Sequence, residues 1–165
     1  MSFQEKINLY IADGYKKTIT NQSGLDTYVM YKNNIVVRIG SDSSYDHYAK
    51  LIKSKIIQSK NAPIITKHET VLNVFDNTKL DYTCTEMELL NELNDDEATR
   101  YKEWNDKEIN NIVDKKLGIS DPFNILDLTR KLVLYAQKNN LFLDLVQSKN
   151  IMKRGETFVH IDPFS

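Results

Sequence analysis

This sequence of 165 residues has one cysteine, no long apolar run and no excess of one charge. Its one cysteine, Cys84, excludes an internal disulfide and is typical of a reducing cytoplasm, where we expect the protein to be. No run approaches the roughly 20 apolar residues of a transmembrane helix, and residues 1–6 lack the apolar core of a signal peptide. The net charge of −1 argues against a basic surface for nucleic acid or an anionic membrane.

The composition is that of one globular domain. Hydrophobic residues make up 41% of the chain and charged residues 27%, which are near the averages of folded proteins. A chain of this length buries about two-thirds of the surface that its unfolded form exposes, which is enough for one sizeable core. Because we find no internal repeat, low-complexity tract or interdomain linker, we predict a single domain over residues 1–165.

The beginning of the chain predicts a helix and then a hairpin. Apolar residues recur on one face of residues 3–11, and Gly14 supplies a helix stop, so a short amphipathic helix is expected. Residues 27–31 and 35–39 are rich in β-branched and aromatic side chains. The turn between them is rich in Asn, which tolerates positive φ, so the pattern predicts a β-hairpin.

A second helix and two strands are expected after this hairpin. Residues 40–44 offer capping groups for the helix. Its apolar face would consist of Tyr45, Tyr48, Ile52 and Ile56. Strand patterns follow at residues 64–66 and 81–90.

The remaining part of the chain predicts two longer helices. The first covers about residues 97–116, and its Tyr101 and Trp104 belong either to the core or to a partner-binding face. The second begins at Pro122 with Asp121 as its N-cap and ends near residues 139–140. This arrangement of strands and helices indicates an α+β protein.

The most informative residues are an acid, an amide and a second acid around a predicted hairpin. Asp144 and Asn150 precede the hairpin, Gly155 lies at its turn, and Asp162 follows its second strand. In protein kinases this order places a proton acceptor before an amide and an acid that hold magnesium. An ordinary hairpin with solvated acids at its ends is the alternative interpretation.

The chain resembles the small early serine/threonine protein kinases of bacteriophages. Four pieces carry the resemblance, which covers most of residues 25–165: residues 36–40, 83–90, 150–152 and 161–163. It implies a minimal kinase-like fold with two lobes. Residues 1–90 would form a hinge and a small lobe, which contains an antiparallel sheet and one helix. Residues 91–165 would form a shortened helical lobe.

The resemblance also implies a site for ATP and Mg²⁺. Asp144 would be the catalytic acceptor of the substrate proton, and Asn150 and Asp162 would bind the metal. Arg38 occupies the position of the phosphate-binding lysine. The carbonyl of Glu86 and the N–H of Glu88 would contact adenine.

Several departures from the kinase pattern leave two classes of function open. Residues 21–27 contain one glycine instead of a glycine-rich loop, Arg38 replaces lysine, and Asn150 follows Asp144 by six positions instead of five. If active, the protein is a serine/threonine kinase that modifies host proteins during takeover of the host. The alternative is an inactive kinase-like protein that inhibits a host defence or transcription factor by contact. Both place it in the host cytoplasm, with host protein and ATP as partners and without nucleic acid or membrane.

Overall fold

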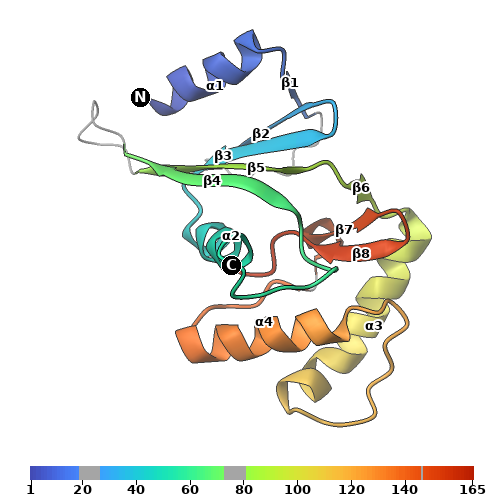
Figure 1. Ribbon diagram of the computed structural model, residues 1–165. Coiled ribbons are helices and arrows are strands. Elements are labelled where there is room, and N and C mark those ends of the chain that lie inside the picture. Colours follow the sequence, from blue (N-terminus) through green and yellow to red (C-terminus); the bar gives the residue numbers. More distant parts are fainter. Residues whose placement is uncertain (19–26, 73–80, 146) are drawn as a thin grey trace. The chain divides into compact units, whose positions relative to one another are not determined.

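The computed structural model describes residues 1–18, 27–72, 81–145 and 147–165. The chain divides into two compact units. Unit 1 consists of residues 1–54 and 64–89, and unit 2 consists of residues 55–63 and 90–165. The described residues form four α-helices, a five-stranded antiparallel sheet and a three-stranded sheet, so the predicted α+β class is confirmed (Figure 1). Within these residues, no helix is both long enough and apolar enough to cross a membrane.

Unit 1 is built on the five-stranded sheet. Its strands are β1 (Lys16–Lys17), β2 (Thr27–Lys32), β3 (Ile35–Gly40), β4 (Ile65–Val71) and β5 (Tyr82–Glu88), in the order β1-β2-β3-β5-β4. The predicted hairpin is confirmed as β2 and β3, which pair from Thr27 with Gly40 to Lys32 with Ile35. Asn33 in its turn has φ 52°, a left-handed conformation that Asn adopts readily.

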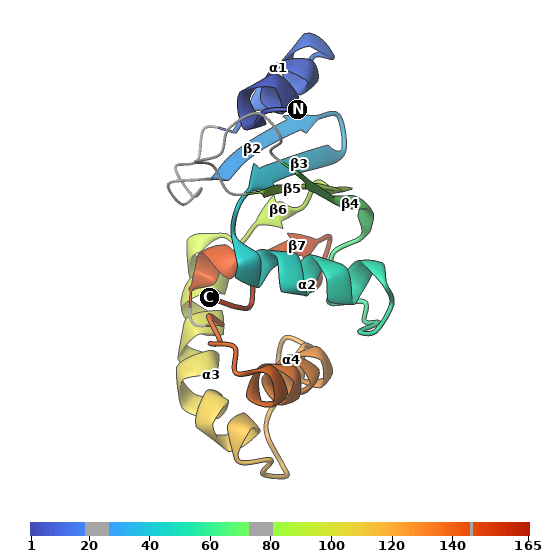
Figure 2. The same ribbon diagram turned by 90° about the vertical axis from the view of Figure 1, so that its left-hand side faces the viewer.

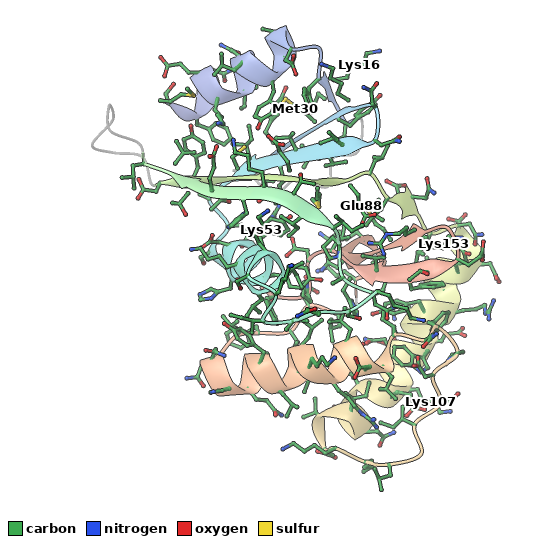
Figure 3. All side chains as sticks on the ribbon, viewed as in Figure 1. Lys16, Met30, Lys53, Glu88, Lys107 and Lys153 are labelled. Carbon is green, nitrogen blue, oxygen red and sulfur yellow. The ribbon has the colours of Figure 1, made fainter. Side chains whose placement is uncertain are left out.

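One helix covers each face of this sheet (Figure 1). The helix α1 (Phe3–Ala12) begins with Ser2 and Glu5 in a capping box, and its Ile7 packs on Met30, Val37 and Ile39. The side chain of Met30, labelled in Figure 3, extends from β2 toward α1. The helix α2 (Ser43–Lys53) packs on the opposite face. The two helices contact different residues of the sheet, because successive side chains along a strand point to opposite faces.

The end of α2 differs from the sequence prediction. Asp42 caps its first turn by accepting hydrogen bonds from the N–H groups of Ser44 and Tyr45, as a capping residue in the predicted segment should. The helix ends at Lys53, because Lys55 has a left-handed φ of 60°. The prediction that Ile56 extends the apolar face is therefore wrong, and its side chain is exposed.

Unit 2 combines two helices with a small sheet. Its elements are β6 (Asn91–Glu92), α3 (Asp95–Val113), α4 (Leu126–Asn139), the 3-10 turn η1 (Ser148–Asn150), β7 (Ile151–Arg154) and β8 (Thr157–His160). The predicted hairpin is confirmed as β7 and β8, with Gly155 at φ 57° in its turn. The strand order is β6-β7-β8, and α4 packs across α3 (Figure 2).

An aromatic cluster forms part of the core of unit 2. Its rings contact one another at centroid distances of 4.8 to 6.4 Å and belong to Tyr101, Trp104, Phe123, Phe158 and His160. The Tyr101 hydroxyl donates to the carbonyl of Leu145, and the Trp104 indole donates to that of Ser120. Both side chains are buried, so the partner-binding face expected as one alternative for Tyr101 and Trp104 is wrong.

The start of α4 also differs from the prediction. The helix begins at Leu126 instead of Pro122, because Asn124 has a positive φ of 52° that interrupts helical geometry. Asp121 still caps the start of α4, although it is not the residue directly before the helix. Its carboxylate accepts hydrogen bonds from the N–H groups of Ile125 and Leu126, at 2.9 and 3.1 Å.

One buried side chain in α3 lacks hydrogen bonds. Asn105 has no solvent exposure, and neither its amide nitrogen nor its amide oxygen has a partner among the described residues. Burying such a group costs free energy, because its hydrogen bonds to water are lost without replacement. Asn105 is therefore a destabilising residue within the core.

Replacing Asn105 with Leu, a side chain of similar size, should stabilise the protein. We expect the free energy of unfolding to rise by about 1–3 kcal/mol, since no hydrogen bond is lost. Thr129→Val is the matched control, because Thr129 is equally buried but bonded to Ile125 and His160. It should destabilise the protein. Urea unfolding measures both changes, and a loss of stability in Asn105→Leu would contradict this account.

Candidate functional site

The C-terminal residues of unit 2 pair with the segment that contains Asp144. Leu143 and Phe164 form an antiparallel bridge, and the N–H of Asp144 donates to the carbonyl of Pro163 at 2.9 Å. The N–H of Ser165 donates to the carbonyl of Phe142 at 3.0 Å. Asp144 and Asp162, which are distant in sequence, therefore lie on adjacent hydrogen-bonded segments.

Asn150 connects these segments to each other. Its side-chain Nδ2 donates to the carbonyl of Asp144 at 2.8 Å, and its own carbonyl accepts from the N–H of Ile161 at 2.9 Å. The turn η1 ends at Asn150, whose N–H donates to the carbonyl of Gln147 at 2.9 Å. The structure thus places Asp144, Asn150 and the segment that contains Asp162 next to one another in unit 2. The shared metal site that the sequence analysis expects for them stays a prediction.

The donor atoms of this cluster are of the kind that magnesium prefers. Asp144 and Asp162 supply carboxylates, and the Oδ1 of Asn150 makes no hydrogen bond to any described residue. No group of three His, Cys, Asp or Glu side chains in the described part of the chain could hold a metal by itself. Mg²⁺ in nucleotide sites usually takes one or two carboxylates and completes its shell with phosphates and water. In the types of their donor atoms, these residues match such a partial ligand set and not a cage made of protein ligands alone.

Arg38 lies in unit 1, on the face of the sheet that α2 covers. Its neighbour Val36 and its cross-strand partner Thr85 lie on the same face, because residues alternate along β3. The guanidinium carbon lies 3.6 Å from the centre of the Tyr45 ring, and Nη2 lies 3.0 Å from Asp42 Oδ2. The sequence analysis missed this role of Tyr45. The one available signal is an aromatic residue in the first turn of the helix that follows Arg38.

The backbone groups of Glu86 and Glu88 that the sequence analysis expects to contact adenine make hydrogen bonds within unit 1. The carbonyl of Glu86 accepts from Thr66 Oγ1 at 3.1 Å, and the N–H of Glu88 donates to the carbonyl of Ile64 at 3.1 Å. Both bonds form next to the irregularity in the pairing of β5 with β4, which lies between Ile65 and Lys67. Figure 3 labels Glu88 at the end of β5.

Other parts of the expected site are placed as follows. Arg38, Glu86 and Glu88 belong to unit 1, whereas Asp144, Asn150 and Asp162 belong to unit 2. The predicted phosphate loop at residues 21–27 lies outside the described residues except for Thr27.

His160 is a buried neutral residue two positions before Asp162. Burial lowers the pKa of its imidazole from 6.5 to about 3. Its Nε2 lies 3.1 Å from Thr129 Oγ1, and that hydroxyl donates its one hydrogen to the carbonyl of Ile125. With the hydroxyl hydrogen directed at Ile125, Nε2 is the donor of its bond to Thr129. A neutral imidazole with fixed bonds supports the strand that leads to Asp162.

Cys84 is the one thiol of the chain, and its surroundings argue against a nucleophile. Burial raises the pKa of the Cys84 thiol, which disfavours the reactive thiolate. The side chain has no solvent exposure and lies on the face of the sheet that α1 covers. It is a core residue.

The depressed pKa of His160 predicts that acid destabilises the protein. Below about pH 6.5 the unfolded chain binds a proton that the folded protein excludes until about pH 3. The free energy of unfolding should therefore be highest above this window and fall by about 1.4 kcal/mol per pH unit within it. His160→Gln should reduce the slope between about pH 5 and pH 7, measured by urea unfolding. His47→Gln, at an exposed histidine, should keep the wild-type slope, and equal slopes in all three proteins would contradict the assignment.

Comparison with known proteins adds no family assignment. No protein-family model matches this chain, and no similarity to a curated protein or to a solved structure is found. Interpretation of the site therefore rests on its own geometry.

Proposed function

We propose that this protein has a minimal kinase-like fold and binds ATP together with Mg²⁺. The observation that carries the proposal is the hydrogen-bonded cluster of Asp144, Asn150 and the segment around Asp162. Backbone bonds of Ile161 and Pro163 place Asp162 on a segment next to Asn150 and Asp144, which supports the proposal. A hairpin with independently solvated acids needs no such cluster.

The proposed reaction is phosphoryl transfer from ATP to a serine or threonine hydroxyl of a host protein. Asn150 Oδ1 and the Asp162 carboxylate would hold Mg²⁺, which neutralises phosphate charge. Asp144 accepts the hydroxyl proton as that oxygen bonds to the γ-phosphorus. The bond from the γ-phosphorus to its bridging oxygen breaks, and ADP leaves.

Arg38 would bind phosphate oxygens in this proposal. Its guanidinium is already oriented by the Tyr45 ring and by Asp42, which reduces the entropy lost on ligand binding. Asp42 takes the place of the glutamate that pairs with the phosphate-binding lysine in kinases. The pairing partner comes from the N-cap of α2 instead of its interior.

Binding of ATP and Mg²⁺ should stabilise the folded protein. At about one hundred times the dissociation constant, the gain is about 2.7 kcal/mol, and we expect the melting temperature to rise by about 5–10 °C. Asp162→Asn should remove the magnesium-dependent part of this shift. Asp127→Asn removes an exposed acid of α4 that pairs only with Lys131 in the described contacts, and it should leave the shift unchanged. Absence of any shift for the wild type at millimolar ATP and Mg²⁺ would reject the proposal.

Phosphoryl transfer is tested separately from binding. Asp144→Asn should keep nucleotide binding but lower transfer of labelled phosphate to host lysate proteins by about 10²–10⁴-fold, because the proton acceptor is lost. Asp127→Asn again serves as the control, and its transfer rate should equal that of the wild type.

A second function remains open because of Arg38. Its contacts with Asp42 and Tyr45 occupy part of the guanidinium, as in a purely structural ion pair. In this alternative the protein inhibits a host factor by direct binding and performs no chemistry. Full inhibition of the host by both Asp144→Asn and Asp162→Asn would favour it, whereas loss of inhibition in both would favour the kinase.

A further inference from the structure

The segment between α2 and β4 belongs to unit 2, although both of those elements belong to unit 1. We name residues 59–62 the strap. Within the strap, the N–H of Asn61 donates to Ser59 Oγ at 3.1 Å, and the N–H of Ala62 donates to the carbonyl of Ser59. These bonds form a tight local turn. Asn61 is buried, with 3% of its surface exposed.

Asn61 closes the outer edge of β8. Its side-chain Nδ2 donates to the carbonyl of Phe158 at 2.8 Å, and its own carbonyl accepts from the N–H of His160 at 2.9 Å. The strand β8 is the last in the order β6-β7-β8, so these two groups have no neighbouring strand. Asn61 therefore acts as a one-residue substitute for the missing strand.

Arg154 holds the strap on both sides of Asn61. Its Nη1 donates to the carbonyl of Lys60 at 2.9 Å, and its Nη2 donates to that of Ala62 at 3.0 Å. Arg154 lies at the end of β7, opposite Thr157. The planar guanidinium is suited to two parallel hydrogen bonds, which a lysine ammonium cannot reproduce with the same geometry.

The segment from Phe158 to Pro163 is consequently fixed from two sides. Asn61 holds the carbonyl of Phe158 and the N–H of His160. On the other side, the N–H of Ile161 bonds to Asn150 and the carbonyl of Pro163 bonds to Asp144. The strands β7 and β8 have only four residues each, so few ladder bonds hold them. The position of Asp162 therefore depends on the strap as well as on the site itself.

We propose that Asn61 and Arg154 are positioning residues, which hold β8 so that Asp162 and Asn150 share one magnesium ion. This inference rests on the proposed function. Magnesium tolerates little deviation from octahedral geometry, so a small displacement of one ligand weakens binding. Groups behind the ligands of a metal typically change its affinity by about 10–100-fold when they are removed.

The test measures metal affinity separately from nucleotide affinity. Mn²⁺, which replaces Mg²⁺ and is visible by electron paramagnetic resonance, is titrated into full-length protein saturated with a non-hydrolysable ATP analogue. Asn61→Ala and Arg154→Ala should raise the dissociation constant of Mn²⁺ about tenfold or more. Binding of the same analogue in EDTA should stay unchanged in both variants, because neither side chain touches nucleotide in the proposal.

The matched control is Asn139→Ala. Asn139 also donates an amide hydrogen bond to a backbone carbonyl, that of Tyr135 at 2.8 Å, but it lies outside the strap. Its removal should leave Mn²⁺ affinity at the wild-type value. Arg154→Lys keeps the charge and loses the paired geometry, so an intermediate loss of affinity is expected.

The outcomes separate this inference from the proposed function. If the wild type binds Mn²⁺ with the analogue and folded Asn61→Ala binds it equally well, the positioning role is overturned while the proposed function stands. If the wild type binds no Mn²⁺ with the analogue, the proposed function fails and the inference fails with it. Should Asn61→Ala not fold, as judged by circular dichroism, Arg154→Lys decides, and wild-type affinity in that variant overturns the inference.

Discussion

The hydrogen bond from the Asn150 side chain to the backbone carbonyl of Asp144 is the contact on which the candidate site depends. It joins the segment after α4 to the segment before β7, and the backbone of Asn150 joins both to Ile161. One buried amide therefore organises three parts of the chain. A carboxylate at this position would lack the donor, and an apolar side chain would leave the Asp144 carbonyl without its partner. Asn meets the requirement for a donor at Nδ2, while its Oδ1 makes no hydrogen bond to a described residue.

Buried polar groups differ in how completely their hydrogen bonds are formed. Asn61 is bonded on both its side chain and its backbone, and His160 is held as a neutral donor to Thr129. Both lie next to the segment that leads to Asp162. Asn105, in contrast, is buried without a partner among the described residues. Buried amides of this protein therefore differ in their contribution to stability, because an amide without hydrogen bonds keeps the cost of its desolvation.

In unit 1 the geometry of the sheet determines which helix each side chain of β3 faces. Alternation along β3 directs Val37 and Ile39 toward α1 and Arg38 toward α2. Arg38 then meets Tyr45 and Asp42 in the first turn of α2. At the end of β5, the carbonyl of Glu86 accepts from Thr66 and the N–H of Glu88 donates to Ile64, so both groups are already bonded within unit 1.

Local sequence patterns by themselves determined the β2–β3 and β7–β8 hairpins, the existence of the helices and the segment that caps α2, because these depend on residues a few positions apart. The end of α2 and the start of α4 were not determined in this way. The acid-amide-acid order also named residues that lie on neighbouring segments of unit 2. Only the tertiary structure decided which side chains are buried, as for Tyr101, and which backbone groups remain available, as for Glu88. It alone revealed the contact of Asn61 with Phe158, which are 97 positions apart. No periodic pattern or turn signal encodes such a contact, because it arises from the meeting of two segments whose separation in sequence is not fixed by local geometry.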